Sequence, residues 1–428
     1  MSTSAPPPSV LHRDTFLDVI RAGSILAVIG QHWLMPVLSY SHGRLATGNA
    51  LTTPGWWAFT WLSQVMPLVF FAGGAANLMS LRRAPSPREW LAGRIGRLLL
   101  PTLPLIGVWL VVPHLLRDFG VPEQPLAVAS AIAGQLLWFL AVYLLVVLTT
   151  PVMAVAHRRW GVAVPVVLTG FALIVDVLRF HGFGLAGYLN AVFVWAAVHQ
   201  LGFLYTEGKL GTLRPRRALV MSAAGFGVTA LLVAFGPYPA SMIGMPGAPV
   251  SNMSPPSAVL VSLAIGQIGL MLALRPQFAR LAARPTAAAG LRWLGARFMS
   301  VYLWHMPALV VVSGVFVVGL GYATPEPGTL RWLAMAPLWL AAAGTVLAVL
   351  LRAFGRFERR PQATGVAIPL PVLAVAALIG ATGMVGLAAR GFAWPLNAEP
   401  LASPLPWCAL VIGSVVLAGS TVTTRLKG

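Results

Sequence analysis

Twelve long apolar runs constrain this chain more than any other feature. A helix that crosses a bilayer needs about 20 consecutive apolar residues. Runs of this kind lie near 16–39, 56–80, 96–116, 126–155, 161–179, 187–206, 218–236, 256–274, 298–320, 331–351, 366–389 and 405–423. Only 9% of the residues are charged, against roughly 25% in soluble domains. Because lipid offers no partner to a backbone amide, each run is predicted to be helical, giving an all-α polytopic membrane helical bundle.

The positive charges alternate with these runs. If the N-terminus is cytosolic, 23 of the 29 Lys and Arg residues lie in cytosolic segments, and only Arg21 lies clearly inside a run. This is the bias of the positive-inside rule, so we expect about twelve transmembrane helices with both termini cytosolic. The net charge of +19 therefore indicates topology and not a nucleic-acid partner. We expect a multi-pass protein of the inner (plasma) membrane, with the bilayer as its surroundings.

The first run carries three ionisable residues on one helical face. Asp18, Arg21 and His32 are spaced so that Arg21 and His32 point within ~20° of one another, and Asp18 within ~60° of Arg21. His32 lies roughly 24 Å from the helix start near Phe16, in the outer half of the membrane. Ionisable groups inside a bilayer are costly and mark functional sites by default. The alternative is an interfacial Asp18–Arg21 ion pair with His32 bonded to a neighbouring helix.

Two arginines stand at the cytosolic entrance of the third run. Arg94 and Arg97 are spaced i, i+3, so both guanidinium groups are expected to point the same way. Guanidinium groups suit phosphate, although an ordinary positive-inside anchor also accounts for them. In the fourth run Trp138, Phe139 and Tyr143 either line a cavity or form an aromatic belt, and composition favours the belt.

Later polar residues give weaker signals. Asp176 and Arg179 lie one turn apart, which is sufficient for an ion pair near the outer surface. The ninth run begins with Tyr302 and His305, and His305 lies roughly 10 Å from its helix start. We therefore expect His305 and His32 at different depths, which argues against a shared metal. No other metal-ligand spacing occurs, and Cys408 is a lone cysteine that is expected to pack in the last run.

Five segments in this order resemble a known family. "RDTFLDVIRAGSILAVIGQH", "FFAGGAANL", "RIGRLLLP", "LWFLAVYLL" and "YLWHMP" are similar to successive motifs of the acyltransferase 3 family of integral membrane acyltransferases. "DVLR", "HQLGFLY" and "SNMSPP" look like features of a bacterial, actinobacterial-type subgroup. The resemblance covers roughly residues 13 to 350.

The resemblance implies a ten-helix core that transfers an acyl group, commonly acetyl from acetyl-CoA, to a hydroxyl of a glycan, lipid or natural product. His32 then matches the essential first-helix histidine, assisted by Asp18 and Arg21, while Arg94 and Arg97 match the pair tied to the acyl donor. Tyr302, His305 and Trp138 are expected near the donor, and no metal is implied. The expected domains are a disordered cytosolic tail (1–12), the acyltransferase core (13–360) and two additional helices with a cytosolic tail (361–428).

The sequence departs from the family pattern in two places. The common Asp-Gly-Leu-Arg-Gly is here Asp18-Val19-Ile20-Arg21-Ala22, which keeps the helical stripe. The late acidic residue of some members is missing from the eighth to tenth runs. A proton-coupled transporter is the competing hypothesis, since twelve spans with buried ionisable groups also suit one, but no twofold hydropathy repeat supports it. A non-catalytic scaffold is the third possibility.

Overall fold

The computed structural model describes residues 14–244, 250–358, 368–394, 399 and 402–419. The predicted N-terminal tail and the predicted domain boundary at residue 360 lie outside the described residues. Helices of the described residues are α1 (Thr15–Leu34), α2 (Thr60–Ser63), α3 (Met66–Leu81), α4 (Pro87–Leu99), α5 (Thr102–Asp118), α6 (Glu123–Gln135), α7 (Leu137–Trp160), α8 (Ala163–Phe180), α9 (Asn190–Thr206), α10 (Pro215–Phe235), α11 (Val259–Ala273), α12 (Arg275–Ala282), α13 (Pro285–Ala296), α14 (Phe298–Ser313), α15 (Leu330–Phe354), α16 (Leu370–Arg390) and α17 (Leu405–Leu417).

The prediction of a polytopic helical membrane protein is confirmed. Nine helical stretches of the described residues are long and apolar enough to cross a membrane, and the bent pair α11 and α12 makes up to ten. The two other predicted runs form α1, which carries Asp18 and Arg21, and the shorter apolar helix α17. Each predicted run therefore contains at least one helix among the described residues, although not every run meets the length and hydropathy needed to span.

A β-hairpin follows α1 where the sequence was predicted to stay helical. Strands β1 (Pro36–Ser41) and β2 (Arg44–Asn49) pair antiparallel, with Pro36 opposite Asn49. The helical prediction to residue 39 was wrong because Pro36 has no backbone N–H to continue the helical hydrogen bonds, and its ring would clash with the preceding turn. The Gln124 side chain of α6 bonds both the amide and the carbonyl of Leu45, and the Thr324 amide donates to the carbonyl of Leu38. These bonds hold the hairpin to α6 on one side and to the segment before α15 on the other.

Helices α3 and α9 pack backbone to backbone in the middle of the bundle. A Cβ added to Gly74 would collide with the carbonyl of His199, and one added to Gly202 with the carbonyl of Phe71. Small residues at helix crossings permit this approach in membranes. Gly74 and Gly202 therefore have a packing role at this crossing.

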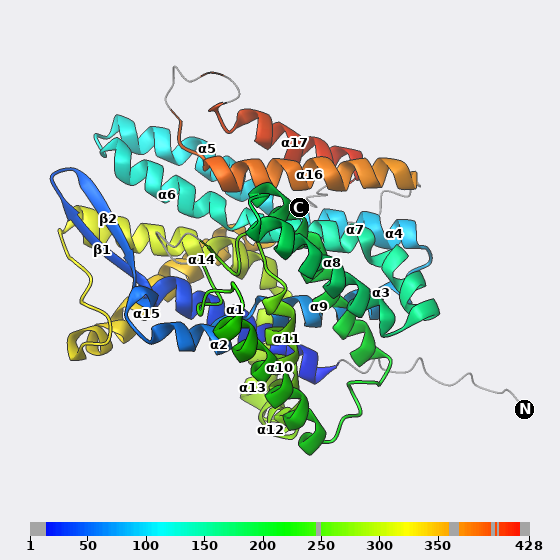
Figure 1. The fold of residues 1–428 in the computed structure, drawn as a ribbon. Helices are drawn as coiled ribbons and strands as arrows, with labels where there is room; N and C mark the ends of the chain where they lie inside the picture. Colours follow the sequence, from blue (N-terminus) through cyan, green and yellow to red (C-terminus); the bar gives the residue numbers. More distant parts are fainter. Residues whose placement is uncertain (1–13, 245–249, 359–367, 395–398, 400–401, 420–428) are drawn as a thin grey trace, which may run out of the picture.

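The last two helices complete the bundle. Figure 1 shows α16 and α17 side by side along the upper edge, with α16 lying across α6 and α7. Gly134 of α6 faces the carbonyl of Leu387 so closely that a Cβ would not fit. The Ser414 hydroxyl donates to the carbonyl of Ala376 at 2.5 Å and joins α17 to α16. The C-terminal pair is thus an integral layer of the bundle.

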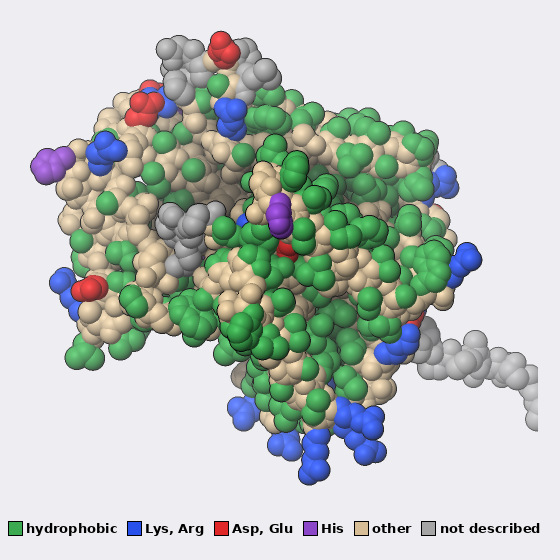
Figure 2. Space-filling model, in the orientation of Figure 1, with side chains coloured by type: hydrophobic (Ala, Val, Ile, Leu, Met, Phe, Trp, Pro, Cys, Tyr) green, Lys and Arg blue, Asp and Glu red, His purple; other side chains and the backbone are tan. Residues whose placement is uncertain are grey.

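The surface agrees with a membrane environment. Figure 2 shows hydrophobic side chains over most of one face, while Lys and Arg gather at its lower end, beneath α10, α12 and α13. Exposed arginines in this region include Arg214, Arg216, Arg217, Arg280 and Arg284. They belong to the segments that the positive-inside rule predicts to be cytosolic.

Candidate active site

Two histidines from distant parts of the chain meet inside the bundle. His32 lies in the last turn of α1 and His305 in the middle of α14. The Nδ1 atom of His32 is 2.8 Å from the Nε2 atom of His305. Their rings are nearly parallel, at 8° and 5.1 Å between centroids. The prediction that they lie at different depths was therefore wrong.

The depth estimate failed because it assumed that both helices start at the same level. The guanidinium of Arg21 lies over the ring of Phe298, the first residue of α14, at 5.0 Å. Arg21 is the sixth residue after Thr15, the start of α1, and therefore lies about 9 Å along this helix. Because Phe298 lies beside Arg21, α14 begins at about the same level. Adding seven further residues places His305 roughly 20 Å along the same axis, against about 26 Å for His32. Side chains bridge this remaining difference.

The hydrogen bonds of the pair determine which nitrogens carry protons. The Nδ1 atom of His305 lies 2.6 Å from the carbonyl oxygen of Tyr302. A carbonyl only accepts, so Nδ1 of His305 donates and, in the neutral ring, Nε2 of His305 is an acceptor. Nδ1 of His32 must then be the donor between the two rings. The neutral His32 ring consequently has its Nε2 lone pair free to accept a proton.

The protein fixes the pair from both helices. The Trp33 indole Nε1 donates to the carbonyl of His305 at 2.8 Å, and Gln31 donates to the carbonyl of Ser63 at 2.5 Å. His305 is completely buried, whereas His32 is only partly buried. The fully buried ring of His305 thus lies behind the partly buried ring of His32. A histidine that is held by a second group in this way has the geometry of a general base.

Arg94 and Arg97 lie on α4, but they take different partners. The Arg94 guanidinium donates to the Ser80 hydroxyl at 2.5 Å and to the carbonyl of Ala76 at 3.4 Å, both on α3. Arg97 is exposed, and its Nε donates back to the carbonyl of Gly93 at 3.1 Å. The structure thus directs Arg94 into the bundle and leaves Arg97 at its surface. The i, i+3 spacing did not bring the two guanidinium groups together as a fork.

A polar cluster lies deeper in the bundle on the same helix, α3. The Asn77 amide nitrogen is 3.1 Å from Nε2 of His199 and 3.4 Å from the Tyr143 hydroxyl. Asn77 and His199 are buried. Among the described residues, Asn77 Oδ1 and Arg94 Nε are buried without a hydrogen-bond partner. A buried polar atom without a partner costs about 1–3 kcal/mol, so both atoms suit a polar ligand that reaches in from the Arg94 side.

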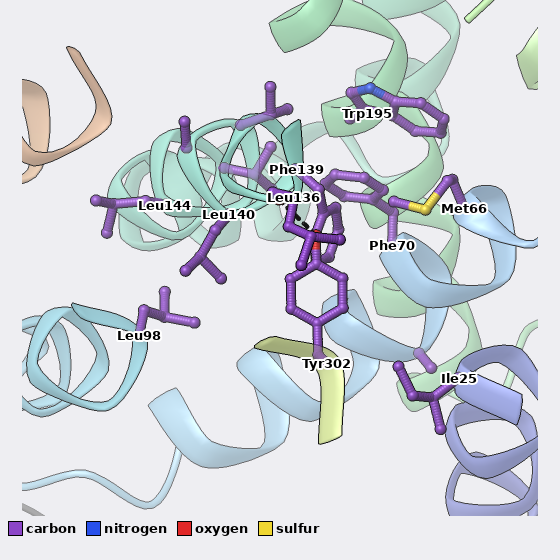
Figure 3. Close-up of a cluster of buried hydrophobic side chains, with 14 of the residues drawn as sticks. Ile25, Met66, Phe70, Leu98, Leu136, Phe139, Leu140, Leu144, Trp195 and Tyr302 are labelled. Carbon is purple, nitrogen blue, oxygen red and sulfur yellow. Dashed lines mark hydrogen bonds between the residues drawn. The ribbon is translucent and has the colours of Figure 1, made fainter. Parts of the chain in front are cut away.

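The Tyr302 side chain makes a hydrogen bond that connects α14 to the backbone of another part of the bundle. Its hydroxyl donates to the carbonyl of Leu136 at 2.6 Å, at the junction between α6 and α7. Figure 3 shows this bond, with the Tyr302 ring lying among Leu136, Phe139 and Phe70. Phe139 is also buried within this cluster, so the predicted aromatic belt was wrong for it. Trp138 is half-buried with its ring edge against Phe139.

The chain is similar to a known protein family. A family model described as "Acyltransferase domain", of the acyltransferase 3 group, matches residues 14–353. The chain belongs to the acyltransferase 3 family. No curated protein matches it, and no solved structure matches it. The matched segment includes both histidines, Asp18, Arg21, Arg94 and Arg97, and it ends at the C-terminus of α15.

This acyltransferase brings together some of the residues that the sequence singled out. His32 and His305 are in contact, and Arg21 joins the start of α14 to α1. Asp18 is half-buried one turn before Arg21. Among the described residues no group of three or more His, Cys, Asp or Glu side chains is placed to hold a metal.

Asp176 and Arg179 did not form the expected simple ion pair. The Asp176 carboxylate accepts bonds from Asn190, the Tyr238 hydroxyl and the Ala258 amide. Arg179 donates instead to two carbonyls in the segment 251–255. Burial, with the neighbouring Asp176 carboxylate, raises the pKa of the Tyr238 phenol above its usual range, so it stays a donor. The pair therefore anchors the loop before α11.

Sequence reasoning missed three contributors. The Ser80 hydroxyl and the Ala76 carbonyl accept hydrogen bonds from Arg94. The only sequence signal for these two residues was that they lie four residues apart on α3, the helix before the one that carries Arg94. Glu358 accepts bonds from the amides of Met299 and Ser300, the first turn of α14. It lies after the tenth predicted run, so a search limited to the runs could not find it. A carboxylate at a helix N-terminus is favourable, and this one fixes the helix that carries His305.

Proposed function

We propose that this acyltransferase moves an acyl group, acetyl in the simplest case, from acyl-CoA to a hydroxyl of a glycan, lipid or natural-product acceptor, with His32 as general base. The observation that carries the proposal is the bond between His32 and His305. It leaves Nε2 of His32 unprotonated on a partly buried ring, and an unprotonated nitrogen is what a base must offer to a hydroxyl. His305 is then a positioning residue, held by the carbonyl of Tyr302.

The reaction has a simple proton balance. The acceptor O–H gives its proton to Nε2 of His32 while its oxygen attacks the thioester carbonyl carbon. The C–S bond breaks, and the CoA sulfur takes the proton back from His32. An ester and free CoA leave, and the enzyme is returned to its starting state. During the cycle His32 carries a positive charge, which the lone pair on Nε2 of His305 stabilises through the bond between the rings.

The donor is proposed to approach from the cytosolic side. Arg97 is exposed at the end of α4, where its guanidinium suits a phosphate of CoA. Arg94 bonds the carbonyl of Ala76, the residue before Asn77. The Asn77 side-chain oxygen has no partner among the described residues and suits an amide N–H of the pantetheine arm. Asp18 and Arg21 are proposed to support the entrance, and Tyr302 and Trp138 the walls. We propose the inner (plasma) membrane as the site, with twelve spans, both termini cytosolic, and domain limits at residues 12 and 360.

The direct test uses membranes that contain the protein and acetyl-CoA labelled in its acetyl group. His32→Ala is expected to lower label transfer by about 10²–10⁴-fold, the usual contribution of a general base. His181→Ala removes an exposed histidine and is the matched control, with unchanged transfer. Normal transfer by His32→Ala would overturn the proposal. Acetyl-CoA consumption also excludes a transporter or scaffold, since neither uses the thioester.

The donor contacts have their own test. Arg94→Ala is expected to raise KM for acetyl-CoA by about 10- to 140-fold, because a hydrogen bond to a charged group is worth about 1.5–3 kcal/mol. Arg88→Ala changes an exposed arginine on the same helix and should leave KM unchanged. An unaltered KM in Arg94→Ala would refute its role in donor binding.

A further inference from the structure

An apolar cavity lies beside the histidine pair, on the outer side. Its volume is about 490 Å³, within the range of small-molecule sites. Trp33 and Leu34, the two residues that follow His32 in α1, line part of its wall. Trp33 is also the residue whose indole bonds the carbonyl of His305. The cavity and the histidine pair therefore share one wall.

The chemistry of the lining excludes a free sugar. None of the lining residues is charged, and apart from indoles the polar side chains are Thr324 and Tyr322. The Thr324 hydroxyl is occupied at Leu38, where it accepts from the amide at 2.7 Å and donates to the carbonyl. A sugar would leave its hydroxyls without partners at a cost of about 1–3 kcal/mol each. Aromatic walls, including Trp332 and Trp339, favour an apolar ligand.

Tyr322 lines the cavity, but its hydroxyl is buried and makes no hydrogen bond among the described residues. A buried hydroxyl adds no accessible polar contact to the cavity wall. A cavity whose walls offer neither a charge nor an accessible hydroxyl suits a long apolar group.

The mouth of the cavity indicates where the ligand comes from. Phe316 and Leu338 line the cavity, yet their exposed fractions are 40% and 63%. Leu338 belongs to α15, which lies in the long apolar stretch Leu330–Glu358, and little of this stretch is buried, so the exposed surface of α15 faces lipid. The opening is therefore toward the hydrocarbon of the bilayer. The donor, which carries a charged CoA, cannot enter by that route.

We infer that this cavity binds the hydrocarbon portion of a lipidic acceptor, which enters sideways from the bilayer and presents its hydroxyl near His32. The inference rests on the proposed function and specifies its acceptor class. Trp33 separates the bound chain from His305, since it lines the cavity and its indole bonds the carbonyl of His305. The donor acyl chain does not occupy this space.

The test uses 1-dodecanol with a diazirine at the end of its chain, photolysed with the protein in nanodiscs. Adducts that excess 1-dodecanol displaces are located by mass spectrometry of peptides. We expect them at residues 316–325 and 332–342. Ala336→Phe and Ala342→Phe fill the cavity and should lower the displaceable labelling about tenfold, as expected when overpacking removes about 1.4 kcal/mol of binding.

The control is Ala334→Phe. Ala334 lies on the same helix, is exposed and does not line the cavity, so its labelling should equal that of the original protein. Equal displaceable labelling in Ala336→Phe, Ala342→Phe and Ala334→Phe would overturn the inference. So would displacement of the probe by lauroyl-CoA in place of dodecanol, because it would assign the space to the donor chain. Labelling should persist in His32→Ala, whose acetyl transfer tests the proposed function separately.

Discussion

Replacing His305 tests whether one ring orients the other. His305→Asn keeps an amide near the position of Nδ1, beside the carbonyl of Tyr302, but it cannot reach His32. His305→Gln places an amide oxygen near the position of Nε2, where it can accept from Nδ1 of His32. In both variants the bond from Trp33 survives, since it goes to the backbone carbonyl of residue 305. Only His305→Gln can therefore accept a hydrogen bond from His32, while both variants keep the Trp33 bond that connects α1 to α14.

The size of the effect follows from the environment of the bond. The bond from His32 Nδ1 to His305 is 2.8 Å long, and His305 is completely buried. His305→Asn leaves the N–H of His32 without an acceptor, which costs about 1–3 kcal/mol. The active arrangement is less populated by the same free energy. We therefore expect kcat to fall about 5- to 140-fold, at 1.4 kcal/mol for each factor of ten.

The assay is the initial rate of acetyl transfer in membranes, measured as a function of acetyl-CoA concentration. KM for acetyl-CoA should stay constant, because His305 does not contact the donor in this scheme, and His305→Gln should recover most of the rate. Wild-type rates in His305→Asn would refute the orienting role. Equal losses in His305→Asn and His305→Gln would refute it as well, since they would show that contact with His32 does not matter.

Three further changes follow from the packing. Gly74→Ala should lower the thermal unfolding temperature, since overpacking against the carbonyl of His199 costs about 1–3 kcal/mol. Gly93 faces open space, so Gly93→Ala should leave that temperature unchanged. Equal unfolding temperatures for the two variants would contradict the close crossing of α3 and α9. Tyr302→Phe removes the bond to the carbonyl of Leu136 and should destabilise the protein by about 1 kcal/mol with little change in kcat. A large loss of kcat at normal stability would instead assign the Tyr302 hydroxyl to catalysis. Asp176→Ala should speed limited proteolysis between residues 236 and 258, and an unchanged cleavage rate would contradict the anchoring of that loop.

Much of the fold could be predicted because lipid allows few alternatives. Hydropathy and basic residues located the twelve apolar runs, since an apolar run in a bilayer has to be helical, but they did not locate the short helices α12 and α13 between two runs. The hairpin after α1 escaped prediction because its residues are apolar enough to extend the first run. Its strands are held by Gln124 and Thr324, and no local pattern connects these two residues with the hairpin.

The site was only partly predictable for a related reason. Periodicity placed Asp18, Arg21 and His32 on one face of a single helix, which is a local property. The meeting of His32 with His305 depends on where α14 starts relative to α1, and this offset is fixed by Arg21 on Phe298 and by Glu358 at the start of α14. Spacing within one helix carries no information about the relative level of two helices.

The packing of α16 has a consequence for how the protein is made. The family domain ends at residue 353, yet α16 covers α6 and α7 so closely that Gly134 has no room for a side chain. The ribosome releases α16 and α17 after all of the residues that form the histidine pair. Until then the small-residue face of α6 must stay open to lipid, and any other helix with a small-residue stripe can associate with it there. Assembly of the outer layer is therefore a late step of biosynthesis, when the enzyme is open to wrong helix partners in the membrane.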